Sequence, residues 1–300
     1  MTGIIQKITA LIMAVISFFA GISGINTKPL KENEYRYGPH ERNTVDIIMP
    51  EGAYGTTRGL ILCIYGGAWI SGDKEGYSAQ LREYASEGYV AAALNYRYVS
   101  DYIHVKDELD DIENALSKVK EVAAEQGCTI NKALLTGASA GAHLSMLYAY
   151  SRADSSPVKP CAVVSESGPT DLSNPEYLVL LAGNDETTLA LLCKLCGVKI
   201  TMKEYRNKSG RYNLWLRAIK KISPVSYVNG NCAPTVIAHG MVDGVVPYSD
   251  AVELDSLLTG AGAQHDFVIF PNSGHFLEND PPQRETLDKL FYEYAKTYLK

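Results

Sequence analysis

The 300-residue sequence lacks an excess of positive charge, since 28 Lys and Arg stand against 34 Asp and Glu, for a net charge of −6. A phosphate backbone requires a basic surface, so this deficit argues against nucleic acid as a partner. A mean hydropathy of −0.09 and the lack of repeated long apolar runs exclude a multi-pass membrane protein. Six cysteines are too few for a disulfide-built scaffold at this length. Hydrophobic residues nevertheless make up 46% of the chain, enough to bury a core.

Only one apolar run approaches membrane-spanning length, and it lies at the amino terminus. Residues 8–27 carry no charge and are flanked by Lys7 and Lys28. As a helix, this run would extend about 30 Å, the thickness of a hydrocarbon core. A basic start, an apolar middle and small residues near the end also describe a secretory signal, although the end matches Ala-x-Ala poorly. We therefore expect 1–27 to be a signal peptide or membrane anchor, and the protein to be secreted or held on the extracytoplasmic side.

The remaining residues, 28–300, alternate between strand and helix patterns. Short apolar runs predict strands at 44–49, 59–65, 90–96, 132–136, 162–165, 234–239 and 267–270. Helical periodicity predicts helices at 77–87, 107–126, 140–150, 249–258 and 283–299. Such alternation is typical of the α/β class, with a mostly parallel sheet and helices on both faces. The interval 172–222 interrupts this order with helical, polar-decorated sequence, which predicts a cap insertion that forms a lid or pocket wall.

The sequence Gly137-Ala-Ser139-Ala-Gly141 lies between a predicted strand and a predicted helix. A serine on such a sharp turn holds its Oγ clear of the backbone, and small neighbours are required because strand and helix approach closely. The helix that begins near Ala140 directs backbone N–H groups toward a developing oxyanion. This pattern predicts a nucleophilic Ser139.

A second turn, Gly66-Gly67-Ala68-Trp69, follows the predicted strand that ends at Tyr65. Residues with little or no side chain let backbone N–H groups turn toward a substrate carbonyl. We therefore expect Gly67, Ala68 and Ala140 to form an oxyanion hole. Trp69 is expected to pack rather than to contact substrate.

A nucleophilic serine requires a base, and the base requires an orienting carboxylate. His275 follows the final predicted strand and Asp243 follows the strand before it, giving the chain order Ser, Asp, His. His143 is interpreted as a packed, hydrogen-bonded side chain, and His239 as a residue that shapes the loop of Asp243. The other carboxylates of this region are explained as helix starts or solvated loop charges: Asp250, Asp266, Glu278 and Asp280.

These motifs resemble the α/β-hydrolase superfamily, in particular its hormone-sensitive-lipase-like esterase branch, and are similar to bacterial acetyl esterases and kynurenine-formamidase-like enzymes. The resemblance spans residues 45–299 and rests on four motifs in order: Tyr-Gly-Gly-Ala-Trp, Gly-Ala-Ser-Ala-Gly, His-Gly-x-x-Asp-x-x-Val-Pro and Gly-His. It implies an α/β-hydrolase fold with Ser139, Asp243 and His275 as catalytic triad. One departure is Tyr65, where the branch usually has a histidine that braces the glycine loop.

The resemblance implies a serine hydrolase that cleaves carboxylic esters through an acyl-enzyme and requires no metal or organic cofactor. By family analogy and export, the expected substrate is a small molecule with a short acyl group on a sugar or similar alcohol. Two other readings stay open: a peptidase of the prolyl-oligopeptidase type and a catalytically silent binding module. No large amino-terminal domain precedes the fold, which disfavours the peptidase, and the complete triad disfavours the silent module.

The sequence alone leaves more than one interpretation for two features, the cysteine pair and the aromatic residues of the insertion. Cys193 and Cys196 are explained by helix packing, by a disulfide, or by metal or redox chemistry. The aromatic residues of the predicted insertion either line a pocket or pack within a lid: Tyr177, Tyr205, Tyr212 and Trp215.

Overall fold

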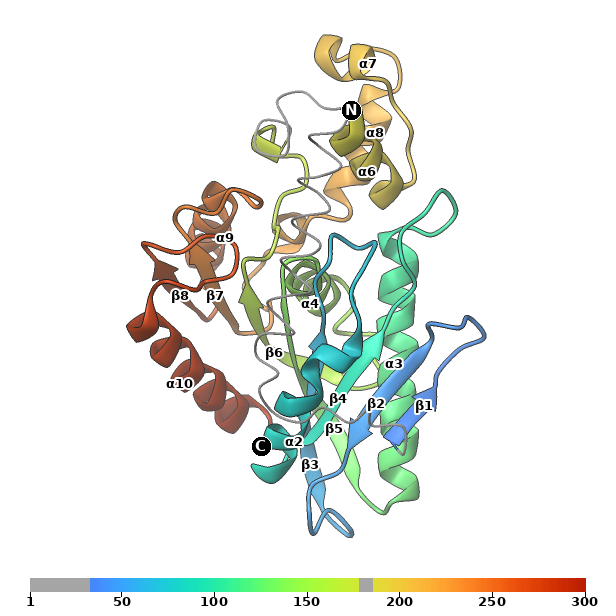
Figure 1. Cartoon of the computed structure of the whole chain (residues 1–300), viewed down its shortest axis with the longest axis vertical. Helices are drawn as coiled ribbons and strands as arrows, with labels where there is room; N and C mark the ends of the chain where they lie inside the picture. The colour runs from blue at the N-terminus through green and yellow to red at the C-terminus, as the bar shows by residue number, and fades with distance from the viewer. Residues whose placement is uncertain (1–32, 178–185) are drawn as a thin grey trace.

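The computed structural model of the chain describes residues 33–177 and 186–300 (Figure 1). The predicted leader at 1–27 lies outside the described residues, as do 178–185 of the predicted insertion. Within the described part, eight strands form one sheet in the order β1-β2-β4-β3-β5-β6-β7-β8. Their bounds are Glu34–Arg36 (β1), Thr44–Ile48 (β2), Thr57–Ile64 (β3), Val90–Asn95 (β4), Thr129–Ala138 (β5), Lys159–Glu166 (β6), Thr235–Gly240 (β7) and His265–Phe270 (β8).

The sheet is parallel from β4 to β8, and β2 runs antiparallel to both of its neighbours. The predicted α/β class and mostly parallel sheet are therefore confirmed. The edge strand β1 is the strand that the sequence did not predict. Its three residues, Glu-Tyr-Arg, contain no apolar run, and only the central tyrosine is partly buried.

The predicted helices form on both faces of the sheet. On one face lie α3 (Val105–Glu125), α4 (Ala140–Ser151) and α9 (Tyr248–Ala261); α4 packs against α3 and shares a buried apolar cluster with α9. On the other face lie α2 (Ser78–Ser86) and α10 (Pro281–Tyr298), where the ring of Tyr84 stacks on Phe291 at 4.9 Å. A short 3-10 helix, η2 (Lys74–Tyr77), leads into α2.

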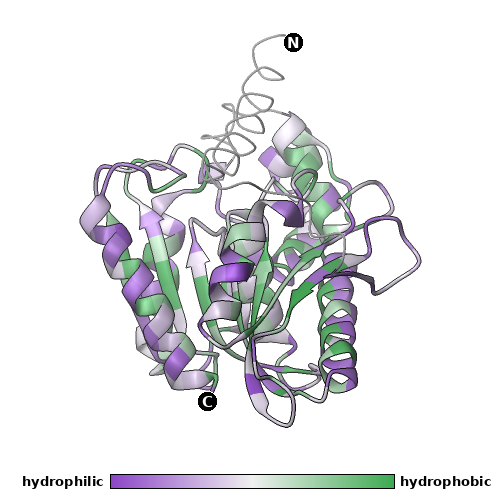
Figure 2. Ribbon diagram, turned by 60° about the horizontal axis from the view of Figure 1, so that its bottom comes forward, coloured by the Kyte–Doolittle hydropathy of each residue, from purple (hydrophilic) through white to green (hydrophobic). Residues whose placement is uncertain are grey.

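The central strands are buried on both faces because helices cover them. Every residue of β4 is buried, as are the last six of β3. Figure 2 shows the hydrophobic colour concentrated on these inner strands. The apolar positions that predict α3 are all buried, as the helical period requires: Leu109, Ile112, Leu116, Val119 and Val122.

Between β6 and β7, the described residues of the predicted insertion form three helices that lie together at one end of the molecule (Figure 1). They are α6 (Glu186–Cys196), α7 (Met202–Asn207) and α8 (Tyr212–Lys220), and the short η3 (Pro224–Tyr227) follows. The rings of Tyr205, Tyr212 and Trp215 pack on one another with centroids 5.5–6.0 Å apart, so these three stabilise the helical group.

Cys193 and Cys196 both lie on α6 as free thiols, and the other four cysteines are also unpaired. Burial raises the pKa of the Cys196 thiol to about 11 and raises that of Cys193 as well. Of the three interpretations of this pair, the described structure therefore supports helix packing. Within 33–177 and 186–300, no helix is both long enough and apolar enough to cross a bilayer.

Candidate active site

Ser139 occupies the single residue between the end of β5 and the start of α4. Its backbone has φ 54° and ψ −122°, a conformation that L-residues adopt only under strain of about 1–3 kcal/mol. Its N–H donates to the carbonyl oxygen of Glu166 at 2.8 Å, which fixes the turn on β6. A Cβ at either Gly137 or Gly141 would overlap the carbonyl oxygen of Ile64. The predicted reason for both glycines, close approach of strand and helix, is thus confirmed.

The glycine loop after β3 is a second strained turn. Gly67, Ala68 and Trp69 have φ values of 129°, 51° and 61°, so three successive residues have positive φ. The carbonyl oxygen of Gly67 accepts hydrogen bonds from the N–H groups of Ile70 and Ser71, both at 3.1 Å. Among the described residues, no protein acceptor takes the N–H groups of Gly67, Ala68 or Ala140. The described fold therefore leaves these three N–H groups unused.

His275 and Asp243 come together from two loops at the same edge of the sheet. Asp243 follows β7, His275 lies between β8 and α10, and His275 Nδ1 donates to Asp243 Oδ2 at 2.8 Å. The other carboxylate oxygen, Oδ1, accepts from the N–H groups of Val245 at 2.8 Å and Val246 at 3.0 Å. Since Nδ1 carries this proton, Nε2 of the neutral ring is the atom that can accept one.

A second imidazole also reaches this carboxylate. His239, the buried fifth residue of β7, places Nε2 3.3 Å from Asp243 Oδ2 and 3.3 Å from the Val246 carbonyl oxygen. Burial alone would raise the pKa of Asp243, but the hydrogen bonds from His239 and His275 outweigh it and hold that pKa well below its ordinary value. Asp243 therefore stays ionised, and the prediction that His239 shapes this loop is confirmed.

The loop that carries His275 is tied down by Asp280. Asp280 Oδ2 accepts from Ser273 Oγ at 2.6 Å and from the Asn272 N–H at 3.0 Å, and Oδ1 accepts from Asn272 Nδ2 at 2.8 Å. Leu277 in the same loop has φ 57°. Asp280 directly precedes α10, as its interpretation as a helix start requires, but it is buried rather than solvated. The two prolines that follow it are a signal for a helix start, whereas no local sequence pattern points to the loop contacts.

Tyr65 braces the glycine loop through a residue that the sequence did not single out. Arg42 Nη2 donates to the Tyr65 hydroxyl at 2.6 Å and to the Gly72 carbonyl oxygen at 3.1 Å. The guanidinium also lies 3.8 Å from the ring centroid of Tyr98. Tyr65 in turn stacks on Tyr96, with centroids 4.5 Å apart. This network connects the start of β2 to the turn that carries the predicted oxyanion donors.

His143, four residues after Ser139, lies entirely within the protein. Its Nδ1 accepts from Trp69 Nε1 at 3.2 Å, and its Nε2 donates to the Ile222 carbonyl oxygen at 2.7 Å. The prediction that His143 is a packed, hydrogen-bonded side chain is confirmed. Trp69 packs as expected, but its indole also lines the adjoining cavity.

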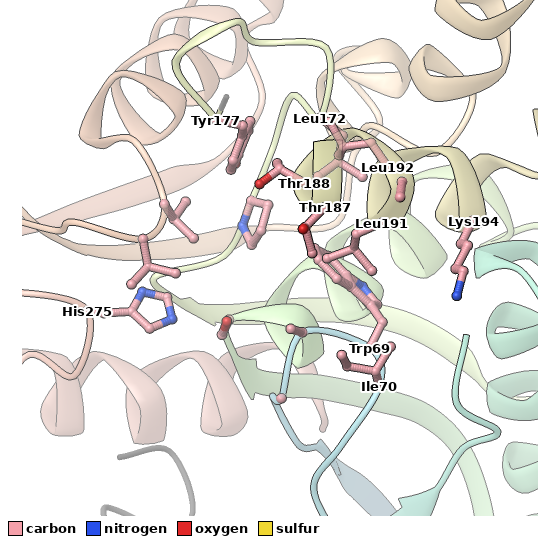
Figure 3. Close-up of a pocket in the computed structure, with 17 residues that line it drawn as sticks. Trp69, Ile70, Leu172, Tyr177, Thr187, Thr188, Leu191, Leu192, Lys194 and His275 are labelled. Carbon is pink, nitrogen blue, oxygen red and sulfur yellow. The ribbon is translucent and has the colours of Figure 1, made fainter. Parts of the chain in front are cut away.

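A cavity of about 260 Å³ contains both Ser139 and His275 in its wall (Figure 3). Gly67 and Ala68 line it as well, whereas Ala140 does not. No hydrogen bond joins the Ser139 hydroxyl to His275 in the described structure; such contacts commonly tighten only when substrate binds. The rest of the wall is mainly apolar: Trp69, Ile70, Pro169, Leu172, Tyr177, Ala190, Leu191, Leu192, Val245 and Val246, with Thr187, Thr188 and Lys194.

Tyr177 is the one aromatic residue of the predicted insertion that lines this cavity. Its hydroxyl donates to Asp250 Oδ2 at 2.5 Å, and the same oxygen accepts from the Thr170 N–H at 3.0 Å. Asp250 lies in the first turn of α9 but is fully buried, so it anchors the segment that enters the insertion. In the ranges that the structure describes, no group of three His, Cys, Asp or Glu side chains could hold a metal ion.

Comparison with known proteins gives consistent relatives. Esterase LipQ of Mycobacterium tuberculosis is 28% identical over 80% of this chain and 55% of its own length. The probable carboxylic ester hydrolase LipM of the same organism is 27% identical over 73% of this chain and 50% of its own. The chain thus spans about half the length of these curated relatives.

Solved structures with the same fold cover nearly the whole chain. A truncated carbohydrate esterase from gut microbiota aligns with a TM-score of 0.69 and 22% identity over 88% of this chain and 96% of its own. Esterase B from Lactobacillus rhamnosis aligns with a TM-score of 0.72 and 19% identity over 98% and 96%. These likenesses establish the fold. The sequence profile of the BD-FAE family matches residues 45–258, most of the chain and all but the last of the motifs described above. The chain therefore belongs to the BD-FAE family, in the hormone-sensitive-lipase-like branch of the α/β-hydrolases.

Proposed function

We propose that the protein is a carboxylic ester hydrolase in which Ser139 is the nucleophile, His275 the general base and Asp243 the orienting carboxylate. The observation that carries the proposal is the buried hydrogen bond between Asp243 and His275 at 2.8 Å. The imidazole of His275 lines the same cavity as Ser139, whose backbone is strained. The esterase names of the relatives support the same reaction class.

In the first half-reaction, Ser139 Oγ attacks the ester carbonyl carbon while its proton passes to His275 Nε2. The bond that forms is Oγ–C, and the carbonyl π electrons move onto oxygen. The ionised Asp243 stabilises the resulting imidazolium through Nδ1–H. The unpartnered N–H groups of Gly67, Ala68 and Ala140 are the donors for the oxyanion, and losing one such donor costs about 3 kcal/mol of barrier.

The oxyanion then collapses and the bond to the leaving oxygen breaks. His275 gives its proton to that oxygen, so a neutral alcohol departs and an acyl-Ser139 ester remains. In the second half-reaction, the same imidazole takes a proton from water, whose oxygen attacks the acyl carbon. Collapse returns the proton to Ser139 Oγ and releases the acid, and the resting site is restored.

We further propose that the substrate carries a short acyl group on a sugar or similar alcohol, and that the protein acts outside the cytoplasm. The small apolar cavity beside Ser139 favours a short acyl chain. The carbohydrate esterase among the structural neighbours favours a sugar as the alcohol component of the ester. The uncharged run at 8–27 favours export of the protein.

The test is labelling by a fluorophosphonate probe combined with turnover of nitrophenyl acetate. We expect labelling of the wild type and of the matched control Ser155→Ala, an exposed serine, and no labelling of Ser139→Ala. Turnover in Ser139→Ala should fall roughly 10⁴-fold or more. Folded wild-type protein that is not labelled would indicate a silent binding module. Faster cleavage of a dipeptidyl anilide than of the acetate would indicate a peptidase.

A panel of acetyl, butyryl and feruloyl esters, on sugar and simple alcohols, then tests the substrate. We expect the acetyl and butyryl esters to be cleaved with the higher kcat/KM. A preference for the bulky feruloyl group would contradict the proposed short-acyl specificity and leave the catalytic assignment intact.

A further inference from the structure

The charge within the cavity is unevenly placed. Lys194 is the one Lys, Arg, Asp or Glu among the described residues of the cavity wall. In Figure 3, His275 and Lys194 lie at opposite sides of the cavity, and Trp69 and Leu191 lie between them. A ligand that extends from the reacting end of the cavity along this apolar surface would therefore meet an ammonium group.

The backbone of Lys194 is held in place by contacts to the core and to a neighbouring helix. Lys194 lies on α6 between Cys193 and Leu195, which are 4% and 0% exposed. Its carbonyl oxygen accepts a hydrogen bond from Nδ1 of His104 at 2.7 Å, and His104 immediately precedes α3. Contacts to the core and to α3 thus fix the backbone position of Lys194 in the cavity wall.

The ammonium itself has no protein partner in the described structure. No ion pair or hydrogen bond to a described residue involves Lys194 Nζ, whereas the nearby Lys199 pairs with Asp101 at 3.6 Å. Lys194 is half-buried, and the cavity around it is mainly apolar. An ammonium in such surroundings loses part of its hydration, and pairing with an anion offsets that cost.

We propose that Lys194 binds a carboxylate at the remote end of the substrate, joined to the reacting ester by an apolar spacer that lies along Trp69 and Leu191. The proposal rests on the proposed esterase function and adds an anionic group to its substrate: an alcohol-side carboxylate keeps the short acyl group proposed above, whereas an acyl-side carboxylate replaces it. The carboxylate belongs either to the acyl group, as in the half-ester of a dicarboxylic acid, or to the alcohol.

The test uses two pairs of esters that differ in one charge. The acyl pair is the 4-nitrophenyl half-ester of adipic acid and the neutral 4-nitrophenyl hexanoate. The alcohol pair is the acetate of 6-hydroxyhexanoic acid and the neutral hexyl acetate. The measured quantity is the ratio of kcat/KM for the anionic ester to that for its neutral partner.

For one of the two pairs, we expect a wild-type ratio above unity by roughly tenfold, the value of one charge-assisted hydrogen bond in a partly exposed site. Lys194→Met, which keeps an apolar stem, should lower that ratio to about one, and Lys194→Arg should retain most of it. The matched control Lys199→Met, which removes an exposed cation outside the cavity wall, should leave the ratio as in the wild type.

Two results overturn the inference: wild-type ratios of one or less for both pairs, or a ratio that Lys194→Met and Lys199→Met change equally. The second result would show that the general field of the protein, and not a specific contact, selects anions. In both cases, Ser139-dependent turnover of the neutral esters would leave the proposed function standing. Failure to hydrolyse any ester would remove both proposals together.

Discussion

The buried neutral ring of His143 makes stability depend on pH in a range where few other groups titrate. Burial lowers the pKa of His143 to about 4, against a smaller opposing effect from its hydrogen bond to the Ile222 carbonyl oxygen. In the unfolded chain the same ring has its ordinary pKa of 6.5. The unfolded state therefore binds a proton more readily, and acid favours unfolding.

The magnitude follows from these two pKa values. A histidine whose folded pKa is lowered contributes stability that is present above about pH 6.5 and is lost as the pH falls toward 4. Between pH 7 and pH 5, the lost free energy of unfolding amounts to about 2 kcal/mol. Protonation would also replace the Nδ1 acceptor of Trp69 by a donor, so the turn that carries Gly67 and Ala68 would lose a support.

The assay is urea unfolding of the wild type and of His143→Gln at both pH values, followed by circular dichroism. The substitution removes the titration, and its own packing cost cancels because only the difference between the two pH values is compared. We expect the wild type to lose about 2 kcal/mol more than the variant. Equal losses in the two proteins would refute the argument that this ring is neutral in the folded state.

Other predictions concern the backbone and the loops of the site. Gly141→Ala should destabilise the protein by about 3 kcal/mol or more, because its Cβ would overlap a backbone carbonyl of β3, whereas Gly260→Ala, in a helix with open space, should stabilise it by about 0.5–1 kcal/mol. Thermal melts compare the two, and equal effects would contradict the steric reason. Tyr65→Phe removes the hydroxyl that accepts from Arg42, so stability should fall by about 1 kcal/mol and nitrophenyl acetate turnover should fall with it. Unchanged unfolding and turnover would show that the brace is unnecessary. Asp280→Ala should lower kcat roughly tenfold, because the loop that carries His275, the proposed general base, loses its anchor; a change confined to KM would be inconsistent with that role.

The sequence predicted the parts of this protein that are encoded locally. Strand and helix order follows from apolar periodicity, and Gly137-x-Ser139-x-Gly141 specifies its own turn, whose steric reason the structure confirms. The pairing of Asp243 with His275 was predictable because strands that are parallel present the loops after their carboxyl ends at one edge.

The remaining features depend on contacts between residues far apart in the chain. Arg42 meets Tyr65 across 23 positions and Asp250 meets Thr170 across 80. Neither Arg42 nor Asp250 belongs to a periodic pattern. From the sequence alone, a charged residue that anchors a buried contact therefore cannot be distinguished from one in a solvated loop. The length of β1 is below what an apolar run can indicate, and its pairing with β2 depends on backbone hydrogen bonds that carry no side-chain signature.

The contact between Arg42 and Tyr65 also bears on how this chain can vary by descent or by design. An imidazole at position 65 would be shorter than a phenol, and Arg42 would lose the oxygen that it reaches at 2.6 Å. Arginine at position 42 and tyrosine at position 65 should therefore co-vary among relatives of this chain. A chimera that exchanges the amino-terminal hairpin for that of a histidine-bearing relative should work only when both positions are transferred together.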